Sequence, residues 1–420
     1  MAQMTKMMSK PRGIINASHV SCHLTCALQL LIHGIEPLRE ALVETSRSKQ
    51  GNAFLLQLGD FLDQYQADSN DDEPIDPSHL YKVMQEKTAM DPHSLGDAVT
   101  ALRRILQAIR TSAAPASFTE LYNELLGGTV RQDIIGTSGS LKRIKSKDRQ
   151  MQCPLPIPGG YSSVEEGLAH ATIEPQTIKG YDWEQATNYV ESELDDCTND
   201  DEDAWITHKN TRFVSLPQHL LLHLQRFTHE PDGTVTPINS SMDVPLTIDM
   251  KAYQCDDSLV NDYQLHGAIL HVLDYEDEDN EEGGHYVSVL RDAGDDWYLV
   301  DDHKVTSLAD DEVLSFLSGR PSSVEASEST YIAVLLLYRR QGSADFSLLL
   351  ESLRTELAQL QLQQSDANGI GKRLKVQWSK GKWYAGVITE YNERTGKHTV
   401  LYDDGEVKEY NLAKKTVEWE

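Results

Sequence analysis

The N-terminal third of the chain carries the periodicity of amphipathic helices. Within residues 13–34, apolar side chains recur three and four positions apart, at Leu24, Ala27, Leu28, Leu31 and Ile32. This spacing predicts a helix that begins near Cys22 and buries one face. Residues 36–49, 52–66 and 95–110 repeat the pattern and predict three further helices.

The pattern changes to that of strands in the second half of the first 340 residues. Residues 213–227 form a continuous apolar run, which predicts one strand buried on both faces. Shorter runs separated by acidic or glycine-containing turns predict strands at residues 246–250, 263–273, 286–290, 297–300 and 331–338. Helices followed by strands indicate an α+β fold with a cleft between its two halves.

Two segments between these halves have weaker patterns. Residues 121–135 predict a short turn and a strand. Residues 136–160 are rich in Gly, Ser, Lys and Pro, and they predict a loop.

The last part of the chain predicts a separate small domain. Residues 343–364 are rich in leucine and predict a helix, and residues 365–371 predict a polar linker. Short strands at close spacing follow, which predicts a small β-barrel. We therefore divide the chain into an N-terminal tail (1–10), a large domain (11–341), a helix with its linker (342–369) and a barrel (370–420).

The acidic balance of the chain bears on its partners. The formal net charge is −28, but residues 370–420 contain ten basic and eight acidic residues. The body of the protein should therefore repel nucleic acid and attract partners with basic surfaces.

The cysteines and the apolar runs indicate an intracellular protein. Five cysteines are scattered along the chain without a C-x-x-C pair, which argues against a disulfide framework and against a zinc site of the finger type. Residues 1–12 lack the apolar core of a secretory signal, and no apolar run is long enough to span a bilayer. We expect no metal ion and no cofactor.

Cys22 is a candidate nucleophile because of its place at the start of the predicted helix. Unpaired N–H groups and the positive end of the helix dipole favour the thiolate, the form that attacks a carbonyl carbon. A small buried cysteine in a core helix is the alternative interpretation, and position alone favours it.

His285 and Asp301 are candidate partners for such a thiol. His285 begins one predicted strand, and Asp301 follows the next strand sixteen residues later. Two antiparallel strands joined by a short hairpin would place the two side chains next to each other. A carboxylate could then orient the imidazole while the ring takes a proton from a thiol.

These segments resemble the motifs of the ubiquitin-specific proteases, and they occur in the family's order. One extra residue separates Asn16 from Cys22, and His23 replaces the usual tyrosine. The helix at 95–110 lies where the family has a conserved helix, and residues 331–340 are similar to its closing strand. The remaining matches are Gly13, Ile14, Leu28, Gln29, Leu216, Pro217, Arg226, Phe227, Tyr263, His271, Gly284, Tyr286, Trp297 and Val305.

The resemblance implies a papain-like fold and a role for each site residue. Cys22 would be the nucleophile that attacks the carbonyl after the C-terminal glycine of ubiquitin, His285 the general base and acid, and Asp301 the orienting carboxylate. Asn16 would donate to the oxyanion, and Asp302 is a secondary candidate near it. The extra residue must bulge out, or Asn16 must point elsewhere.

The family often has a zinc-binding fingers subdomain in the region that follows residue 136. Only Cys153 and Cys197 lie nearby in this sequence, and each is alone. We expect fingers without metal, or shortened ones. The acidic run at 191–203 is interpreted as a solvated face that could also meet a basic ligand.

Residues 370–420 resemble Tudor-type domains. Such barrels can hold a methylated lysine or arginine in a ring of aromatic side chains beside an acidic group. Trp378, Tyr384 and Tyr402 fit the ring and Asp404 the acid, whereas Lys408 falls where an aromatic residue is often found. The same aromatics could instead fill the small core.

Together these features predict a cysteine-type deubiquitinase of the nucleus or the cytoplasm. Its partners would be ubiquitin, ubiquitinated proteins and, through the barrel, a methylated histone or another methylated protein. The alternative is a weak or inactive ubiquitin-binding scaffold that uses the same fold. A general papain-like peptidase is disfavoured by the order of the motifs and the missing secretory signal.

Overall fold

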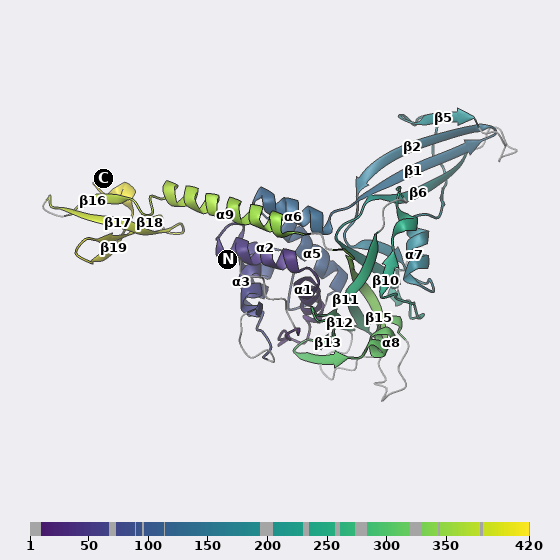
Figure 1. Cartoon of the computed structure of the whole chain (residues 1–420), viewed down its shortest axis with the longest axis horizontal. Helices are drawn as coiled ribbons and strands as arrows, with labels where there is room; N and C mark the ends of the chain where they lie inside the picture. Colours follow the sequence, from purple (N-terminus) through teal and green to yellow (C-terminus); the bar gives the residue numbers. More distant parts are fainter. Residues whose placement is uncertain are drawn as a thin grey trace. The chain divides into compact units, whose positions relative to one another are not determined.

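The chain divides into two compact units. The computed structural model describes residues 10–66, 73–88, 90–94, 96–112, 114–193, 205–229, 235–256, 261–273, 284–319, 330–342, 345–378 and 381–419. The first unit is Met1–Leu350 and the second is Glu351–Glu420. Figure 1 labels the elements of both.

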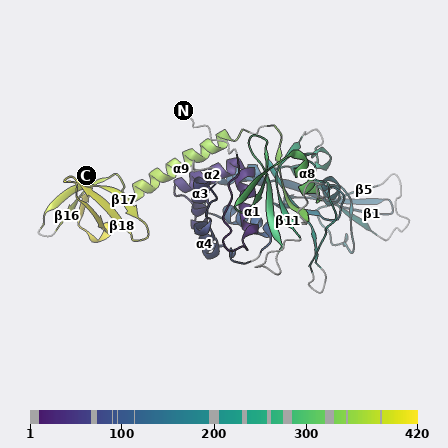
Figure 2. The same ribbon diagram turned by 90° about the horizontal axis from the view of Figure 1, so that it is seen from below.

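Helices form the N-terminal half of the first unit, as the periodicity predicts. They are α1 (Cys22–Gly34), α2 (Glu36–Arg47), α3 (Ala53–Gln66), α4 (Ser78–Lys87), α5 (Ala98–Arg110) and α6 (Ala116–Leu126). The helix predicted at 95–110 begins only at Ala98, because the Asp97 side chain caps it by accepting the Thr100 N–H at 2.7 Å. α1 packs against α5 and against the sheet strands β11 and β12 (Figures 1 and 2).

The central sheet supports α1 and carries most of the strands that the sequence predicts. Its order is β14-β13-β12-β11-β15-β7-β3, with β10 paired to β11. Only β3 and β7 pair in parallel among these described strands. The bounds are β3 (Leu155–Pro158), β7 (His219–Gln225), β10 (Thr247–Asp249), β11 (Asp262–Val272), β12 (His285–Arg291), β13 (Trp297–Asp301), β14 (Lys304–Leu308) and β15 (Tyr331–Arg340).

The outer side of this sheet is covered by shorter elements. α7 (Val164–Ala171) packs against β3, and α8 (Asp310–Ser318) packs against β15 and β11. A small hairpin, β8 (Phe227–His229) with β9 (Val235–Pro237), lies outside the main sheets.

A second sheet projects from the first unit (Figure 1), and it corrects three expectations. Its order is β4-β6-β1-β2-β5. The segment 136–160, expected as a loop, contains most of a long β1–β2 hairpin with Gly139 at φ 49° in the turn. β2 carries polar residues on both faces because neither face borders the core, so it lacks a strand's alternation. The bounds are β1 (Thr129–Ser138), β2 (Leu141–Gln150), β4 (Gln176–Ile178), β5 (Val190–Glu193) and β6 (Ile206–Ser215).

The other two corrections concern the ends of this sheet. The single strand expected at 213–227 is divided between β6 and β7, which belong to different sheets. Pro217 lies in the gap, where its missing N–H is not needed for a ladder. Residues 121–126 complete α6 rather than forming a turn, and the strand starts at Thr129.

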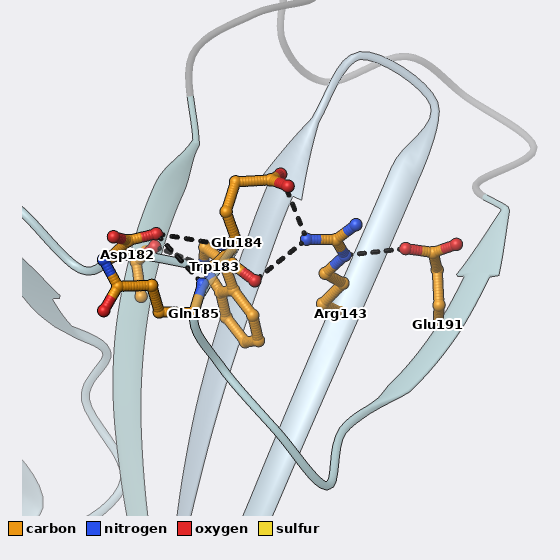
Figure 3. Close-up of polar contacts among 7 residues, drawn as sticks. Arg143, Asp182, Trp183, Glu184, Gln185 and Glu191 are labelled. Atoms are coloured by element: carbon orange, nitrogen blue, oxygen red, sulfur yellow. Dashed lines mark hydrogen bonds and ion pairs between the residues drawn. The ribbon is translucent and has the colours of Figure 1, made fainter.

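Arg143 of β2 connects several segments of the projecting sheet, and Figure 3 shows its polar contacts. The Arg143 guanidinium lies 4.8 Å from the Tyr189 ring centroid and 4.6 Å from that of Trp205. It also pairs with Glu191 at 2.6 Å and donates to the carbonyl oxygen of the fully buried Trp183 at 3.2 Å. These contacts link β2, β5 and the segment before β6. Cys153 is described, whereas Cys197 and most of the acidic run lie outside the described residues.

The second unit contains a five-stranded antiparallel sheet in the order β19-β18-β17-β16-β20. Leu374, Val376, Ile388, Val400, Tyr402 and Leu412 form its core. The helix before it, α9 (Ser347–Ala367), extends past its expected end, so the expected linker at 365–371 is shorter. The strands are β16 (Arg373–Gln377), β17 (Trp383–Asn392), β18 (Lys397–Tyr402), β19 (Val407–Tyr410) and β20 (Val417–Trp419).

Candidate active site

Cys22 is the first residue of the central helix of the first unit. The helix begins there because the Ser21 carbonyl oxygen accepts the N–H groups of Leu24 and Thr25 at 2.9 and 3.0 Å. The Cys22 thiol is free, and its residue is 3% exposed. The expected helix start is therefore correct, and the sulfur lies at the end of α1 that bears the positive dipole.

His285 and Asp301 meet across the β12–β13 hairpin. The strands pair antiparallel, with Ser288 opposite Val300, which brings the first residue of β12 to the last residue of β13. His285 Nε2 lies 2.6 Å from Asp301 Oδ1, the arrangement that the hairpin spacing predicts.

The Cys22 thiol makes a hydrogen bond with the same imidazole ring. Burial alone would lower the pKa of His285, but the hydrogen bonds and charges of Asp301 and Cys22 raise this pKa to about 10. The His285 ring is therefore protonated at neutral pH. Burial opposes the ionisation of Asp301, but its bond to His285 holds the pKa of this carboxyl below the usual value.

Asn16 lies beside this group, and the extra residue before Cys22 does not displace it. Residues 17–20 form an exposed turn with His19 at φ 56°. Beyond this turn the chain returns, and the Ser21 N–H and hydroxyl donate to Asn16 Oδ1 at 3.1 and 2.7 Å. The additional residue therefore bulges out, which was one of the two alternatives that the sequence left open.

Asp302 connects, through hydrogen bonds, the segments that carry Asn16 and Thr25. Its Oδ2 accepts from Asn16 Nδ2 at 2.8 Å, and its Oδ1 accepts from the Thr25 hydroxyl at 2.9 Å. Asp302 has φ 49°, a conformation that few residues other than glycine adopt. Burial raises the pKa of Asp302 and the bond from Asn16 opposes that rise.

The same carboxylates raise the question of a metal ion. Ligand atoms of His285, Asp301 and Asp302 lie within 4.8 Å of one another. Each side chain already has hydrogen-bond partners in the structure, namely the imidazole for Asp301 and the Asn16 amide and Thr25 hydroxyl for Asp302. These hydrogen bonds already engage the carboxylates of Asp301 and Asp302.

Comparison with known proteins identifies the family. The sequence model described as "Ubiquitin carboxyl-terminal hydrolase" matches residues 12–338, well over half of the chain. The chain belongs to the ubiquitin carboxyl-terminal hydrolase family. The predicted resemblance to this family is thereby confirmed.

Two curated relatives each match a part of this family member. Ubiquitin carboxyl-terminal hydrolase 21 of Arabidopsis thaliana is 32% identical over 151 residues, which are 35% of this chain and 18% of that protein. Histone-lysine N-methyltransferase TRX1 of Oryza sativa subsp. japonica is 47% identical over 51 residues, 12% of this chain and 5% of that protein. Both matches thus span less than a fifth of the relative's own length.

Solved structures of SAGA DUB modules share the fold. The SAGA Ubp8/Sgf11/Sus1/Sgf73 DUB module bound to ubiquitin aldehyde superposes with a TM-score of 0.60 at 18% identity. The match covers 81% of this chain and 72% of that chain. The predicted α+β, ubiquitin-specific-protease fold is therefore correct. No helix among the described residues is long and apolar enough to cross a membrane.

The structure of this family member also reveals supporting residues that sequence reasoning missed. The Ser21 hydroxyl donates to Asn16, and the Thr25 hydroxyl donates to Asp302. The sequence pattern predicts only that Ser21 and Thr25 lie at the start of a helix. The signal that could have identified these two residues is a polar side chain at a buried position, since both residues are 1% exposed. Gly284 packs directly against the ring of His271, and a side chain there would collide with it.

The second unit of the chain brings together the aromatic residues expected in a ring. The Trp378 ring centroid lies 4.7 Å from that of Tyr384 and 5.5 Å from that of Tyr402. Tyr402 is 3% exposed and belongs to the core, so packing accounts for part of the cluster. Tyr410 was missed, and its hydroxyl accepts from that of Tyr402 at 3.1 Å.

Asp404 and Lys408 each contact another residue of the second unit. Asp404 is exposed, and its carboxylate accepts the N–H of Glu406 at 3.0 Å in a turn. The Lys408 ammonium lies 3.5 Å from the Trp378 ring centroid and 2.9 Å from the Glu406 carboxylate. A cation of the chain itself therefore covers the Trp378 face.

Proposed function

We propose that this protein is a cysteine-type deubiquitinase that hydrolyses the bond after the C-terminal glycine of ubiquitin. The observation that carries the proposal is the contact of Cys22 with His285 and of His285 with Asp301. These residues come from three different elements. A cysteine that only packs in a core helix needs no imidazole and no carboxylate beside its thiol. The purely structural interpretation of Cys22 therefore leaves this contact unexplained.

The first chemical step is attack of the Cys22 sulfur on the carbonyl carbon of the last ubiquitin residue. The pKa of His285, at about 10, keeps the ring protonated at neutral pH. A protonated imidazole beside Cys22 stabilises the thiolate electrostatically. A carbon–sulfur bond forms, and the carbonyl oxygen becomes an oxyanion.

Collapse of this intermediate breaks the carbon–nitrogen bond, and the His285 ring gives its proton to the departing lysine amine. The neutral ring then takes a proton from water, whose oxygen attacks the thioester carbon. The carbon–sulfur bond breaks, which releases the ubiquitin carboxylate and restores the Cys22 thiolate beside the protonated ring. Asp301 keeps the ring oriented through both steps, since it accepts from Nε2 and leaves the other nitrogen toward the thiol.

Asn16 is proposed to stabilise the oxyanion, with Asp302 as its positioning residue. One Asn16 N–H is directed to Asp302, and the amide's second N–H can donate to the oxyanion. A donor of this kind is worth roughly 2.7–4 kcal/mol at comparable sites. Asp302 accepts hydrogen bonds and therefore cannot itself stabilise a negative oxygen while it is ionised.

Ubiquitin is the proposed partner of the first unit. Support comes from the family and from the neighbouring DUB module, which is described as bound to ubiquitin aldehyde. The acidic charge of the chain outside residues 370–420 suits a ligand with a basic face. A location in the nucleus or the cytoplasm belongs to the same proposal, because ubiquitin conjugates are made there.

An activated-ubiquitin probe with a C-terminal electrophile tests the proposal. We expect a covalent adduct on Cys22 of the full chain, and turnover of a ubiquitin C-terminal amide. An adduct that forms without turnover would favour the inactive-scaffold alternative. If the probe leaves Cys22 unmodified, hydrolysis at this site is excluded.

A second role is proposed for the C-terminal unit, as a reader of methylated lysine or arginine. The cluster of Trp378, Tyr384 and Tyr402 supports it, because a methylated ammonium binds aromatic faces by cation–π attraction. The match to a histone-lysine N-methyltransferase over 51 residues is consistent with a module shared with chromatin proteins. Titration of the full chain with methylated and unmethylated histone peptides tests the role, and equal affinities would refute it.

A further inference from the structure

A cavity in the first unit lies away from the proposed active site. It measures about 420 Å³ and is bordered by the C-terminal end of α1, the first residues of α2 and the ends of β12 and β15. α1 carries Cys22 at its other end, and β12 carries His285 at its other end. The cavity is therefore about 20 Å from the thiol along either element.

The lining of this cavity is polar and rich in guanidinium groups. Four arginines border it, namely Arg39, Arg291, Arg339 and Arg340, together with three carboxylates. A positive lining is unusual in a chain whose net charge is −28. Sites for uncharged small molecules have a comparable volume but are mostly apolar.

The three carboxylates are accounted for by other partners. Glu36 lies 3.5 Å from Arg39, and Asp295 lies 3.3 Å from Arg291. Asp292 Oδ1 accepts the N–H groups of residues 294 and 296 at 2.8 and 2.9 Å. These contacts leave the carboxylates engaged at the rim.

Two arginines have no carboxylate within ion-pair distance in the part of the chain that the structure describes. Arg340 donates only to neutral amide oxygens, at 3.2 Å from Gln218 Oε1 and 3.4 Å from Asn261 Oδ1. Arg339 is exposed and has no ion pair with a described residue. Their positive charge is therefore available to a ligand.

Some residues that line the cavity also contain buried polar atoms without partners. Among the described residues, Arg39 Nε and His219 Nδ1 have no hydrogen-bond partner, although these residues are only 3% and 2% exposed. Arg291 Nε is a third such atom. Buried donors are rarely left unsatisfied unless water or a ligand serves them.

The nearby histidines are consistent with a positive potential. Burial, reinforced by the charge of Arg339, lowers the pKa values of His219 and His266 to about 3. Both rings are thus neutral at pH 7 and can donate or accept a hydrogen bond.

We propose that this cavity binds a free small polyanion that carries two or more phosphate groups. Guanidinium groups pair with phosphate oxygens through two parallel N–H bonds, and several arginines in one cavity call for several anionic groups. The N-terminus of α2, which has twelve residues, adds its positive end.

Calorimetric titration of the full chain with inorganic pyrophosphate, at fixed ionic strength, tests the proposal. We expect saturable binding with one site per chain. Arg339→Gln should weaken it about ten- to a hundred-fold, because a charge-assisted pair is lost. The affinity of Arg339→Lys for pyrophosphate should lie between those of Arg339→Gln and the unaltered chain, since lysine retains the charge without the planar fork.

The matched control is Arg149→Gln, which removes an exposed arginine of β2 in the projecting sheet. It should leave pyrophosphate binding unchanged. Absence of saturable binding, or an Arg339→Gln protein that binds as tightly as the unaltered chain, would overturn the proposal. An equal loss in Arg149→Gln would also overturn it, because it would indicate diffuse attraction. Because Arg339 is exposed, its substitution tests binding without disturbing the core.

Discussion

The proposed active site and the aromatic cluster of the second unit differ in what occupies the space between their side chains. In the first, Asn16 and Asp302 bind supporting residues, while the Cys22 sulfur remains a free thiol beside an imidazole. In the second, Lys408 lies over the ring that a ligand cation would need. The two sites therefore differ in their occupants: the first holds a group of mutually hydrogen-bonded side chains, and the second holds a cation of the chain itself.

The difference follows from how the two sites are constructed. Polar groups in the first unit are fixed by hydrogen bonds of 2.8 and 2.9 Å between segments far apart in sequence, and by the bond of 2.6 Å across the β12–β13 hairpin. In the second unit the contact comes from a long, half-exposed lysine side chain. Such a side chain can leave at modest cost, whereas the hydrogen-bonded group cannot.

The largest effect should come from Cys22→Ala, which removes the nucleophile. We expect hydrolysis of a fluorogenic ubiquitin amide to fall about 10⁴-fold or more. Ubiquitin affinity, measured by calorimetry, should change little because only the sulfur atom is lost. Cys255→Ala is the matched control, since Cys255 is an exposed cysteine in the same unit. A Cys22→Ala protein with substantial activity would remove this thiol from the mechanism.

Asp301→Asn should reduce the rate about 10²- to 10⁴-fold, because the imidazole loses its orienting carboxylate. It should also move the alkaline limb of kcat/KM. In the unaltered protein this limb should lie near pH 10, where the pKa of His285 lies. Without the Asp301 charge that pKa falls, so the limb moves to lower pH. A limb that does not move would show that another group titrates there.

The same pKa shift predicts how stability depends on pH. Folding raises the pKa of His285 from 6.5 to about 10, so the protonated ring stabilises the native state. This contribution is complete below pH 6.5 and is lost as the pH rises through 10. Denaturant unfolding of the unaltered chain should therefore show a decline over that window. The decline should be smaller in His285→Ala.

Asn16→Ala should lower turnover about 10²- to 10³-fold through loss of an oxyanion donor. Ubiquitin binding should be nearly unchanged. The control is Ser21→Ala, which removes a bond to Asn16 Oδ1 but keeps the amide donor. A Ser21→Ala protein as slow as Asn16→Ala would mean that Asn16 acts only by holding the loop.

Sequence reasoning was sufficient for the hairpin that carries His285 and Asp301. Both residues lie at the ends of short strands, and antiparallel pairing is fixed by the turn between them. The start of α1 was likewise predictable, because the apolar spacing and the site of Cys22 are local properties.

Other features depend on contacts that the local pattern does not encode. Residues 141–150 form a strand although their composition favours a loop, because pairing with β1 supplies the hydrogen bonds. The support of Asp302 by Thr25 joins residues 277 positions apart. Lys408 was noted only as a missing aromatic residue, since its place over Trp378 follows from the twist of a small sheet.

The smallest predicted effect tests directly whether Lys408 occupies the place of a ligand cation on the Trp378 ring. Lys408→Ala should free the Trp378 face and strengthen binding of a trimethyl-lysine peptide about two- to thirty-fold, the range of one cation–π contact. Fluorescence anisotropy with the full chain measures this change. Trp378→Ala, combined with Lys408→Ala, should abolish the gain because the face itself is removed. If Lys408→Ala binds methylated and unmethylated peptides equally, the cluster is a packed core and the lysine only shields it.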